Sequence, residues 1–221
     1  MLRLLSKMYT KKASGAAFTF ILFVALSSVL VQFVSPYADD LRGAVHLESG
    51  GQHPSLKHWF GTDAAGRDLF TLTIYAGLSS LKVAIAVVLL SVVIGVPIGM
   101  FSGVSSKKTD DVLMRIVDGF LAFPPLMLPL IITSVLGPSL NNVIIGISMS
   151  WFPWYVRIAR SQAMIILSSG YVSVSKSMGA GKLHIIKNHI FPNSIGPFLV
   201  QGTIDAGYAI LTAAGLSFIG L

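Results

Sequence analysis

Long runs of apolar residues constrain this sequence more than any other feature. Five such runs consist mostly of Leu, Ile, Val, Ala, Gly and Phe: Ala13–Val34, Gly77–Phe101, Ile116–Leu136, Val143–Ile166 and Ser194–Ala214. A helix needs about 20 apolar residues to cross the hydrocarbon core of a bilayer. Only 11% of the residues are charged, against about 25% in soluble domains. We therefore expect an all-α, polytopic bundle of five transmembrane helices.

These runs divide the chain into three predicted parts. Residues 1–36 form an N-terminal tail and a first transmembrane helix, residues 37–75 an external loop, and residues 76–221 a core that holds the other four spans. The loop is polar, with eight charged residues and three histidines. The first apolar run is longer than the apolar region of a signal peptide, and Pro36 ends it, so we expect an uncleaved helix. A cleaved signal peptide is the alternative.

Basic residues orient the predicted bundle. With the N-terminus in the cytoplasm, the inner side holds twelve of them: Arg3, Lys7, Lys11, Lys12, Lys107, Lys108, Arg115, Arg157, Arg160, Lys176, Lys182 and Lys187. The outer side keeps four: Arg42, Lys57, Arg67 and Lys82. Cytoplasmic loops of membrane proteins carry such an excess. We therefore interpret the net charge of +7 as membrane topology rather than nucleic-acid binding, and expect a multi-pass protein of the cytoplasmic membrane with its N-terminus inside.

Patterns of catalytic or metal-binding side chains do not stand out. The sequence has no cysteine, which excludes disulfides, thiolate metal sites and cysteine nucleophiles. The stretch Gly179–Lys182 lacks the first glycine and the Ser or Thr of a phosphate-binding loop. His46, His53 and His58 are unevenly spaced, so we expect them to be solvated rather than metal ligands. We predict a chain that is not an enzyme and binds no metal or ATP of its own.

Prolines and glycines mark two of the spans. Span three contains Pro124, Pro125 and Pro129, and proline breaks or bends a helix. The break is either a packing kink or a device for lining a pathway. Span two carries glycines at intervals of four residues: Gly95, Gly99 and Gly103. Small residues in such a stripe let helices approach closely, so we predict a packing role for it.

Two acidic residues lie within or beside the predicted spans. Asp118 follows Arg115 by three residues, so the two share a helix face and we predict an ion pair between them. Asp205 falls near the middle of span five, where a carboxylate is costly unless it is paired or hydrated. It is either a functional group or a partner in a hydrogen bond to a nearby Ser, Thr or backbone group.

The inner segment 170–193 combines polar and apolar residues at helical spacing. We predict one short helix that Gly179 stops and a second over about residues 182–191 that Pro192 ends. Two short amphipathic helices joined by glycines are too short to span a membrane. They lie either on the membrane surface or against a partner protein.

This inner segment resembles the coupling loop of permease subunits of ABC importers, which docks into a groove on the ATPase subunit. The matching residues are Tyr171, Val172, Gly179, Ala180, Ile185, Ile186, His189, Ile190, Pro192 and Asn193. Val174 and Ser175 stand where much of the family has alanines. By resemblance, these residues other than Ile190 form the ATPase-docking loop.

Further stretches, in the same order, are similar to the C-type subunit of peptide-type permeases. They are Gly61-Thr62-Asp63 with Gly66-Arg67-Asp68, Met114-Arg115 with Asp118, Ala122-Phe123-Pro124, Gly137-Pro138, Asn142-Val143-Ile144, Trp154-Tyr155 with Arg157, Gly215-Leu216-Ser217-Phe218 and Gly220-Leu221. Ala213 stands where the family often has Glu. The family also has a sixth helix, so the resemblance implies that this sequence is truncated before it.

The resemblance implies an ATP-driven importer that carries di- or oligopeptides across the cytoplasmic membrane. Its partners would be a second permease subunit, two ATPase subunits that bind ATP and Mg²⁺, and an external substrate-binding protein. The pathway candidates are Asp118, Pro124, Pro125 and Asp205. Nickel chelates and oligosaccharides are alternative substrates of the same machinery.

Two other classes stay open. One is an ATP-independent, proton-coupled transporter that uses Asp118 and Asp205. Five spans without a visible inverted repeat weaken it. The other is a membrane subunit with a structural role and no transport activity.

Overall fold

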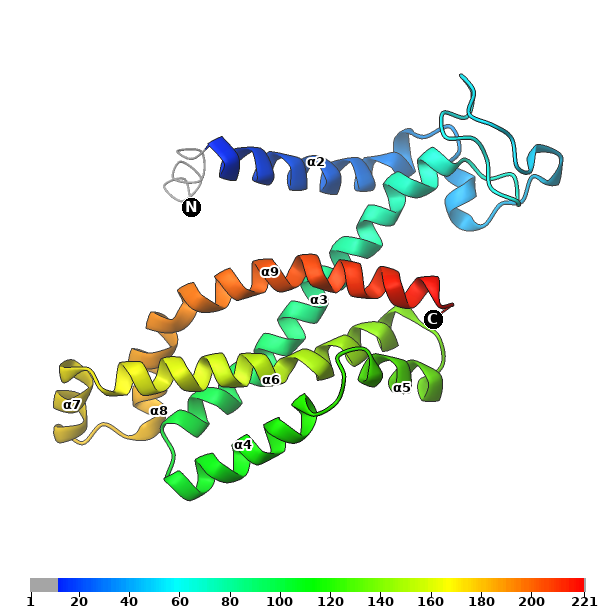
Figure 1. Ribbon diagram of the computed structural model, residues 1–221. Helices are drawn as coiled ribbons and strands as arrows, with labels where there is room; N and C mark the ends of the chain where they lie inside the picture. The colour runs from blue at the N-terminus through cyan, green and yellow to red at the C-terminus, as the bar shows by residue number, and fades with distance from the viewer. Residues whose placement is uncertain (1–11, 221) are drawn as a thin grey trace. The chain divides into compact units, whose positions relative to one another are not determined.

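The computed structural model describes residues 12–220, which form helices and connecting loops (Figure 1). The helices in chain order are α2 (Lys12–Val34), α3 (Leu69–Gly103), α4 (Lys107–Leu121), α5 (Met127–Leu136), α6 (Leu140–Leu167), α7 (Gly170–Ser177), α8 (Lys182–Ile185) and α9 (Phe191–Phe218). Short 3₁₀ turns η1 (Ala38–Arg42) and η2 (Leu47–Ser49) follow α2, and a π-helical turn η3 (Ile186–Ile190) joins α8 to α9. Within this described range the only extended pairing is an isolated bridge between Thr62 and Asp68. The predicted all-α class is confirmed.

The described residues form two compact units, 12–82 and 83–220, and α3 (Leu69–Gly103) includes residues of both. The predictions for Arg3, Lys7, Lys11 and Leu221 fall outside the described residues. The three-part division at residues 36 and 75 follows membrane topology and stays a prediction.

In the first unit, α2 lies against the beginning of α3. A Cβ on Gly77 would overlap Ser28 Oγ, so only a glycine allows this approach. The hydroxyls of Ser35 and Thr71 lie 2.8 Å apart and join the helices near the end of α2. The rest of α2 exposes large apolar side chains, Phe33 at 77%. Such a surface fits lipid better than water.

The loop before α3 is folded around the motif from Gly61 to Asp68. Gly61 and Gly66 have positive φ, and a Cβ on Gly66 would overlap the carbonyl oxygen of His46. Asp63 Oδ1 accepts 2.9 Å hydrogen bonds from the backbone N–H groups of Ala65 and Arg67. Arg67 Nη2 closes the turn at 2.7 Å from Asp63 Oδ2. These bonds hold the pKa of Asp63 below its usual range, and the bond from the Arg67 backbone N–H contributes most.

Asp68 connects this loop to α3. Its Oδ2 accepts a 2.8 Å bond from the Thr71 N–H, which caps the first turn of the helix. Its own N–H donates to Asp40 Oδ2 at 2.7 Å, and its Oδ1 lies 3.0 Å from His58 Nδ1. His58 is therefore buried rather than solvated, and that prediction was wrong. Burial raises the pKa of Asp68, but the bonds from Thr71 and His58 outweigh it and lower the pKa overall.

The second unit is organised around α6. The helices α4, α5 and α9 all contact α6, and Figure 1 shows α9 on one side of it and α4 and α5 on the other. The glycine stripe of α3 faces α6 as predicted. A Cβ on Gly99 would overlap the carbonyl oxygen of Val156, and one on Gly95 would lie 2.6 Å from that of Phe152. The two backbones therefore touch through the glycines.

The predicted proline break in span three is present. The chain leaves helical geometry between α4 and α5 at Pro124 and Pro125, so these two helices share the predicted span Ile116–Leu136. The predicted helix end at Pro192 was wrong. Pro192 is the second residue of α9 and follows the π-helical turn η3. The segment from Lys182 to Phe218 is continuous through α8, η3 and α9.

Within residues 12–220, two helices are both long and apolar enough to cross a bilayer by composition alone, residues 14–34 and 69–103. The helices α6 and α9 have 28 residues each, or about 42 Å at 1.5 Å per residue, which exceeds a hydrocarbon core of about 30 Å. Both helices carry polar side chains that face other helices, such as Tyr155 on α6 and Asp205 on α9.

The contact between α3 and α6 predicts a large effect of one methyl group. Gly99→Ala places a Cβ against the Val156 carbonyl, so we expect a loss of about 1–3 kcal/mol in unfolding free energy and a lower melting temperature in detergent. Gly119→Ala is the control, because no atom lies within 4 Å of a Cβ at that position. Equal melting temperatures for the two variants would contradict this packing.

Asp68 predicts acid sensitivity of the external loop. Its folded pKa is lower than its unfolded pKa, so its contribution to stability is present at neutral pH and is lost as the pH falls below the ordinary value of 3.8. Trp59 packs on Phe70 with ring centroids 5.0 Å apart and reports on this region. In a Trp151→Phe, Trp154→Phe background, we expect its fluorescence to change below that pH.

The matched variants separate Asp68 from its neighbours in this titration. Asp68→Asn should show the acid-state emission already at about pH 7. Asp39→Asn removes a largely exposed carboxylate of the same loop and should titrate like the parent. Parent-like emission of Asp68→Asn at both pH values would refute the role of Asp68.

Candidate functional site

The α7–η3 segment, residues 170–190, folds as a tight helical hairpin beside the adjoining ends of α6 and α9 (Figure 1). Its turn depends on Gly179, whose φ is +89°, a region that L side chains rarely adopt. The Gly179 N–H donates to the Lys176 carbonyl at 2.9 Å, and the Ala180 N–H to the Ser175 carbonyl at 3.0 Å. These bonds satisfy the last carbonyls of α7. The predicted stop at Gly179 is confirmed.

One face of this segment is anchored in the protein. Val172, Ile185 and Ile190 are buried in a cluster that also contains residues of α3, α6 and α9. Ala180 and Ile186 pack against the same cluster. Because packed apolar side chains resist displacement, the segment and the adjoining ends of α6 and α9 form one packed body.

The opposite face of the segment is apolar and exposed. Met178 and Leu183 are 83% and 77% exposed, and Tyr171 and Val174 are more than half exposed. Four large apolar side chains on so short a hairpin exceed what a solvated surface requires. The face therefore suits contact with lipid or with another protein.

Polar groups fasten the two arms of the hairpin to each other. His189 Nε2 lies 3.2 Å from Ser175 Oγ, and the His189 ring lies 5.8 Å from that of Tyr171. Within the second arm, Asn193 Nδ2 donates to the His189 carbonyl at 2.6 Å. The fold thus brings together the residues that the resemblance matched in the two arms, with Gly179 and Ala180 at the turn between them. Pro192 and Asn193 belong to the first turn of α9.

Two ion pairs hold α4 against α6. Arg157 Nη2 lies 2.6 Å from Asp118 Oδ1, with both side chains about half exposed. The partner of Asp118 is therefore Arg157 rather than the predicted Arg115. Helix spacing allowed the Arg115 pair, but the neighbouring helix supplies a closer donor.

The second pair, Asp110 and Arg160, is less exposed and forms more hydrogen bonds. Arg160 donates to both carboxylate oxygens of Asp110, from Nε at 2.6 Å and from Nη2 at 2.5 Å. Ser102 Oγ adds a third bond to this carboxylate. The Arg160 hydrogen bonds, together with Ser102, outweigh burial and hold the pKa of Asp110 below its usual range. Such a bidentate pair fixes orientation as well as distance.

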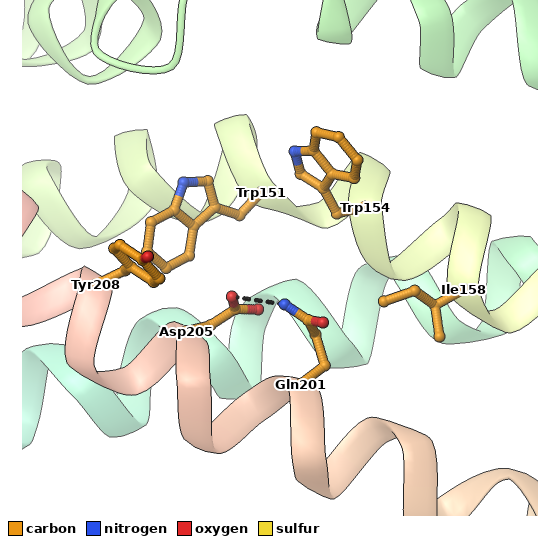
Figure 2. Close-up of a pocket in the computed structure, with 6 residues that line it drawn as sticks. All are labelled: Trp151, Trp154, Ile158, Gln201, Asp205 and Tyr208. Carbon is orange, nitrogen blue, oxygen red and sulfur yellow. Dashed lines mark hydrogen bonds between the residues drawn. The ribbon is translucent and has the colours of Figure 1, made fainter.

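Asp205 lies at a cavity between α6 and α9. Tyr155 Oη donates to Asp205 Oδ2 at 2.6 Å, and Gln201 Nε2 donates to Oδ1 at 2.9 Å. The prediction allowed a hydrogen bond to Ser, Thr or backbone; the partners are instead a tyrosine and a glutamine. The cavity of about 230 Å³ is lined by Trp151, Trp154, Ile158, Gln201, Asp205 and Tyr208. Figure 2 shows Asp205 and Gln201 side by side on α9, facing the two indoles of α6.

The four pathway candidates do not form one site. Asp118 lies on α4, and Pro124 and Pro125 are exposed in the link between α4 and α5. The residues that line the Asp205 cavity come from α6 and α9 alone. Within residues 12–220, no three His, Asp or Glu side chains converge as metal ligands would.

Sequence reasoning missed the groups around Asp205 and Asp110. Gln201 precedes Asp205 by four residues, so helix periodicity could have placed the two side chains on one face. Tyr155, Trp151 and Ser102 gave no such signal, because they reach these carboxylates or this cavity from other helices.

Residues 95–221 match the family described as the inner membrane component of binding-protein-dependent transport systems. The chain belongs to this family, and is an integral membrane protein. The predicted family is confirmed.

Several relatives align over most of the chain. It is 38% identical over 210 residues to a probable D,D-dipeptide transport system permease protein of Escherichia coli, covering 95% of this chain and 70% of the relative. It is 37% identical over 201 residues to a putative peptide transport system permease protein of Brucella suis, covering 91% of this chain and 67% of that relative. A dipeptide transport system permease protein of Alkalihalophilus pseudofirmus is 39% identical over 170 residues, which cover 77% of this chain and 56% of the relative.

The ion pairs between α4 and α6 predict unequal effects of two arginines. Arg160→Ala removes two hydrogen bonds and leaves a mostly buried carboxylate, so we expect a loss of about 1–3 kcal/mol in unfolding free energy. Arg115→Ala removes an exposed side chain and should change it by less than about 0.5 kcal/mol. Denaturant titration in mixed micelles measures both. Equal losses would show that the Asp110–Arg160 pair does not hold α4.

Proposed function

We propose that this chain is the membrane-spanning permease subunit of an ATP-driven importer of di- or oligopeptides. The support for the substrate class is that three relatives of high coverage are named as dipeptide or peptide transport permeases. Nickel chelates and oligosaccharides are the alternatives for the same machinery. The chain would perform no covalent chemistry.

The observation that carries the proposal is the two-faced α7–η3 segment. One face is buried against α3, α6 and α9, and the other presents Tyr171, Val174, Met178 and Leu183. A segment that only had to rest on the membrane would not need so firm an attachment to three helices. We infer that the exposed face docks into an apolar groove of an ATPase subunit.

The same segment provides a mechanical route from the ATPase to the solute pathway. Only Ser168 and Ser169 separate α6 from α7, and α8 continues through η3 into α9. A displacement of the hairpin would therefore be passed to α6 and α9, the helices on either side of the Asp205 cavity. Rigid-body movements of this kind interconvert two packed arrangements, and ATP binding would favour one of them.

The remaining components follow from the proposed class. Two ATPase subunits would hold ATP and Mg²⁺, a second permease subunit would complete the pathway, and an external binding protein would deliver the solute. The chain would lie in the cytoplasmic membrane with its N-terminus and the α7–η3 segment inside. The loop before α3 would then face the binding protein.

The rival is a proton-coupled transporter that uses Asp205 and needs no ATPase. Asp205 is held by Tyr155 and Gln201 and lines a cavity, which is compatible with a proton-binding group. Its other candidate, Asp118, is ion-paired with Arg157 and does not line that cavity.

The exposed apolar face of the α7–η3 segment predicts which substitutions weaken binding of the ATPase. Met178→Asp and Leu183→Asp place a charge on the exposed apolar face, and burying it against a partner is unfavourable. We expect each to reduce co-purification of the ATPase by at least about 10-fold, which corresponds to about 1.4 kcal/mol. Membrane insertion should not change, because both side chains are exposed.

Leu56→Asp is the matched control, because Leu56 is fully exposed in the loop before α3. It should retain the ATPase. Loss of ATPase in all three variants would point to a general defect, and retention in all three would reject docking through this face. Solute uptake in the absence of any ATPase would favour the proton-coupled rival.

A further inference from the structure

We propose that the cavity between α6 and α9 binds the protonated amine of the transported solute, with Asp205 as the counter-ion. The inference deepens the proposed function by naming the solute group that this chain recognises, and it rests on that function for its biological role. The binding itself is a property of the cavity and can be tested without the ATPase.

Two hydrogen bonds orient the Asp205 carboxylate and leave some of its acceptor positions unused. Tyr155 Oη donates to one oxygen at 2.6 Å and Gln201 Nε2 donates to the other at 2.9 Å. An ionised carboxylate accepts about four hydrogen bonds. Two donors therefore fix its orientation, while each oxygen can still accept another bond from a ligand.

Among the described residues, no cation forms an ion pair with this carboxylate. In residues 12–220, the ion pairs of Arg42, Arg67, Arg157 and Arg160 all involve other acids. The six side chains that line the cavity include no Lys, Arg or His. A carboxylate at membrane depth is costly without a positive partner. A cationic ligand would supply that partner, whereas a neutral ligand would leave the charge uncompensated.

The walls of the cavity suit an organic ammonium better than a metal ion. Trp151, Trp154 and Tyr208 line it with aromatic rings, and Ile158 adds an apolar surface. Figure 2 shows the two indoles above Asp205 and the Tyr208 ring beside it. Aromatic faces attract ammonium groups, and the indole of Trp is the best of them. A hard divalent cation would instead need several more oxygen ligands.

The size of the cavity limits what enters it. Its volume of about 230 Å³ accommodates an amino group with its first side chain, but not a whole oligopeptide. Trp154 and Tyr208 are more than half exposed, so the rest of the solute can extend past them. The geometry therefore selects for a free amino end and places little restriction on the remainder of the solute.

The test uses the two cavity tryptophans as reporters. The chain has three tryptophans, and Trp59→Phe leaves only Trp151 and Trp154. The full chain carrying this substitution, in nanodiscs, is titrated with alanyl-alanine and with N-acetyl-alanyl-alanine, which differ in the charged amine. We expect a saturable change in emission with the free dipeptide and an affinity at least about 10-fold lower for the acetylated one.

Variants locate the binding group. Asp205→Asn keeps the shape and should reduce the affinity for alanyl-alanine by at least about 10-fold. Asp205→Glu keeps the charge and should bind alanyl-alanine more tightly than Asp205→Asn does. Asp111→Asn, at an exposed carboxylate of α4, should bind like the parent. Helical circular dichroism and size-exclusion profiles check that each variant is folded.

Several outcomes would overturn the inference. The first is the absence of a saturable change up to about 100 mM dipeptide, which is far above the millimolar range of weak binding. The second is an equal affinity for the two dipeptides. The third is parent-like binding by Asp205→Asn. The dipeptide comparison needs no variant of Asp205, so it decides the question even if Asp205→Asn misfolds. Amine binding without ATPase docking would refute only the proposed function, and docking without amine binding only this inference.

Discussion

The contact between the backbones of α3 and α6 is the constraint on which the second unit depends. Lipid offers no hydrophobic force to press helices together, so close van der Waals contact must do so. The glycines at 95 and 99 bring α3 against the carbonyl groups of Phe152 and Val156. With α3 fixed to one side of α6, the other sides of α6 remain for α4, α5 and α9. The sides of α6 that carry Tyr155, Arg157 and Arg160 therefore meet α4 and α9.

Polar groups in this protein are used sparingly and in fixed geometry. Asp63 and Asp68 order the loop before α3 through backbone N–H groups. Asp110 and Asp118 are neutralised by arginines of α6. In the loop and on α4 alike, each of these carboxylates faces backbone N–H groups or a guanidinium that compensates its charge. Asp205 differs, because its two donors are neutral and it faces a cavity.

The sequence predicted several local features, and failed where a neighbouring helix or the geometry of the preceding turn decides. The helical class, the stop at Gly179 and the role of the glycine stripe follow from residue type and spacing, and the structure has them. Helical spacing predicted an ion pair between Arg115 and Asp118, yet Asp118 pairs with Arg157 on α6. Pro192 was expected to end a helix, but a preceding π-helical turn lets the chain continue. The aromatic wall opposite Asp205 belongs to a different helix and had no sequence signal.

The π-helical turn at Ile186–Ile190 holds one surplus residue ahead of a distant site. A π turn accommodates one residue more than an α-helical turn and does so within the turn. Deleting that surplus residue would restore α-helical geometry and leave the residues downstream on nearly the same faces. Deleting a residue within α9 ahead of Gln201 would instead rotate everything downstream by about 100°, one residue's share of a 3.6-residue turn. Asp205 and Tyr208 would then leave the cavity without any change in their own chemistry. A one-residue deletion should therefore be tolerated better in the π turn than in α9, because only the second deletion changes the phase of the helix.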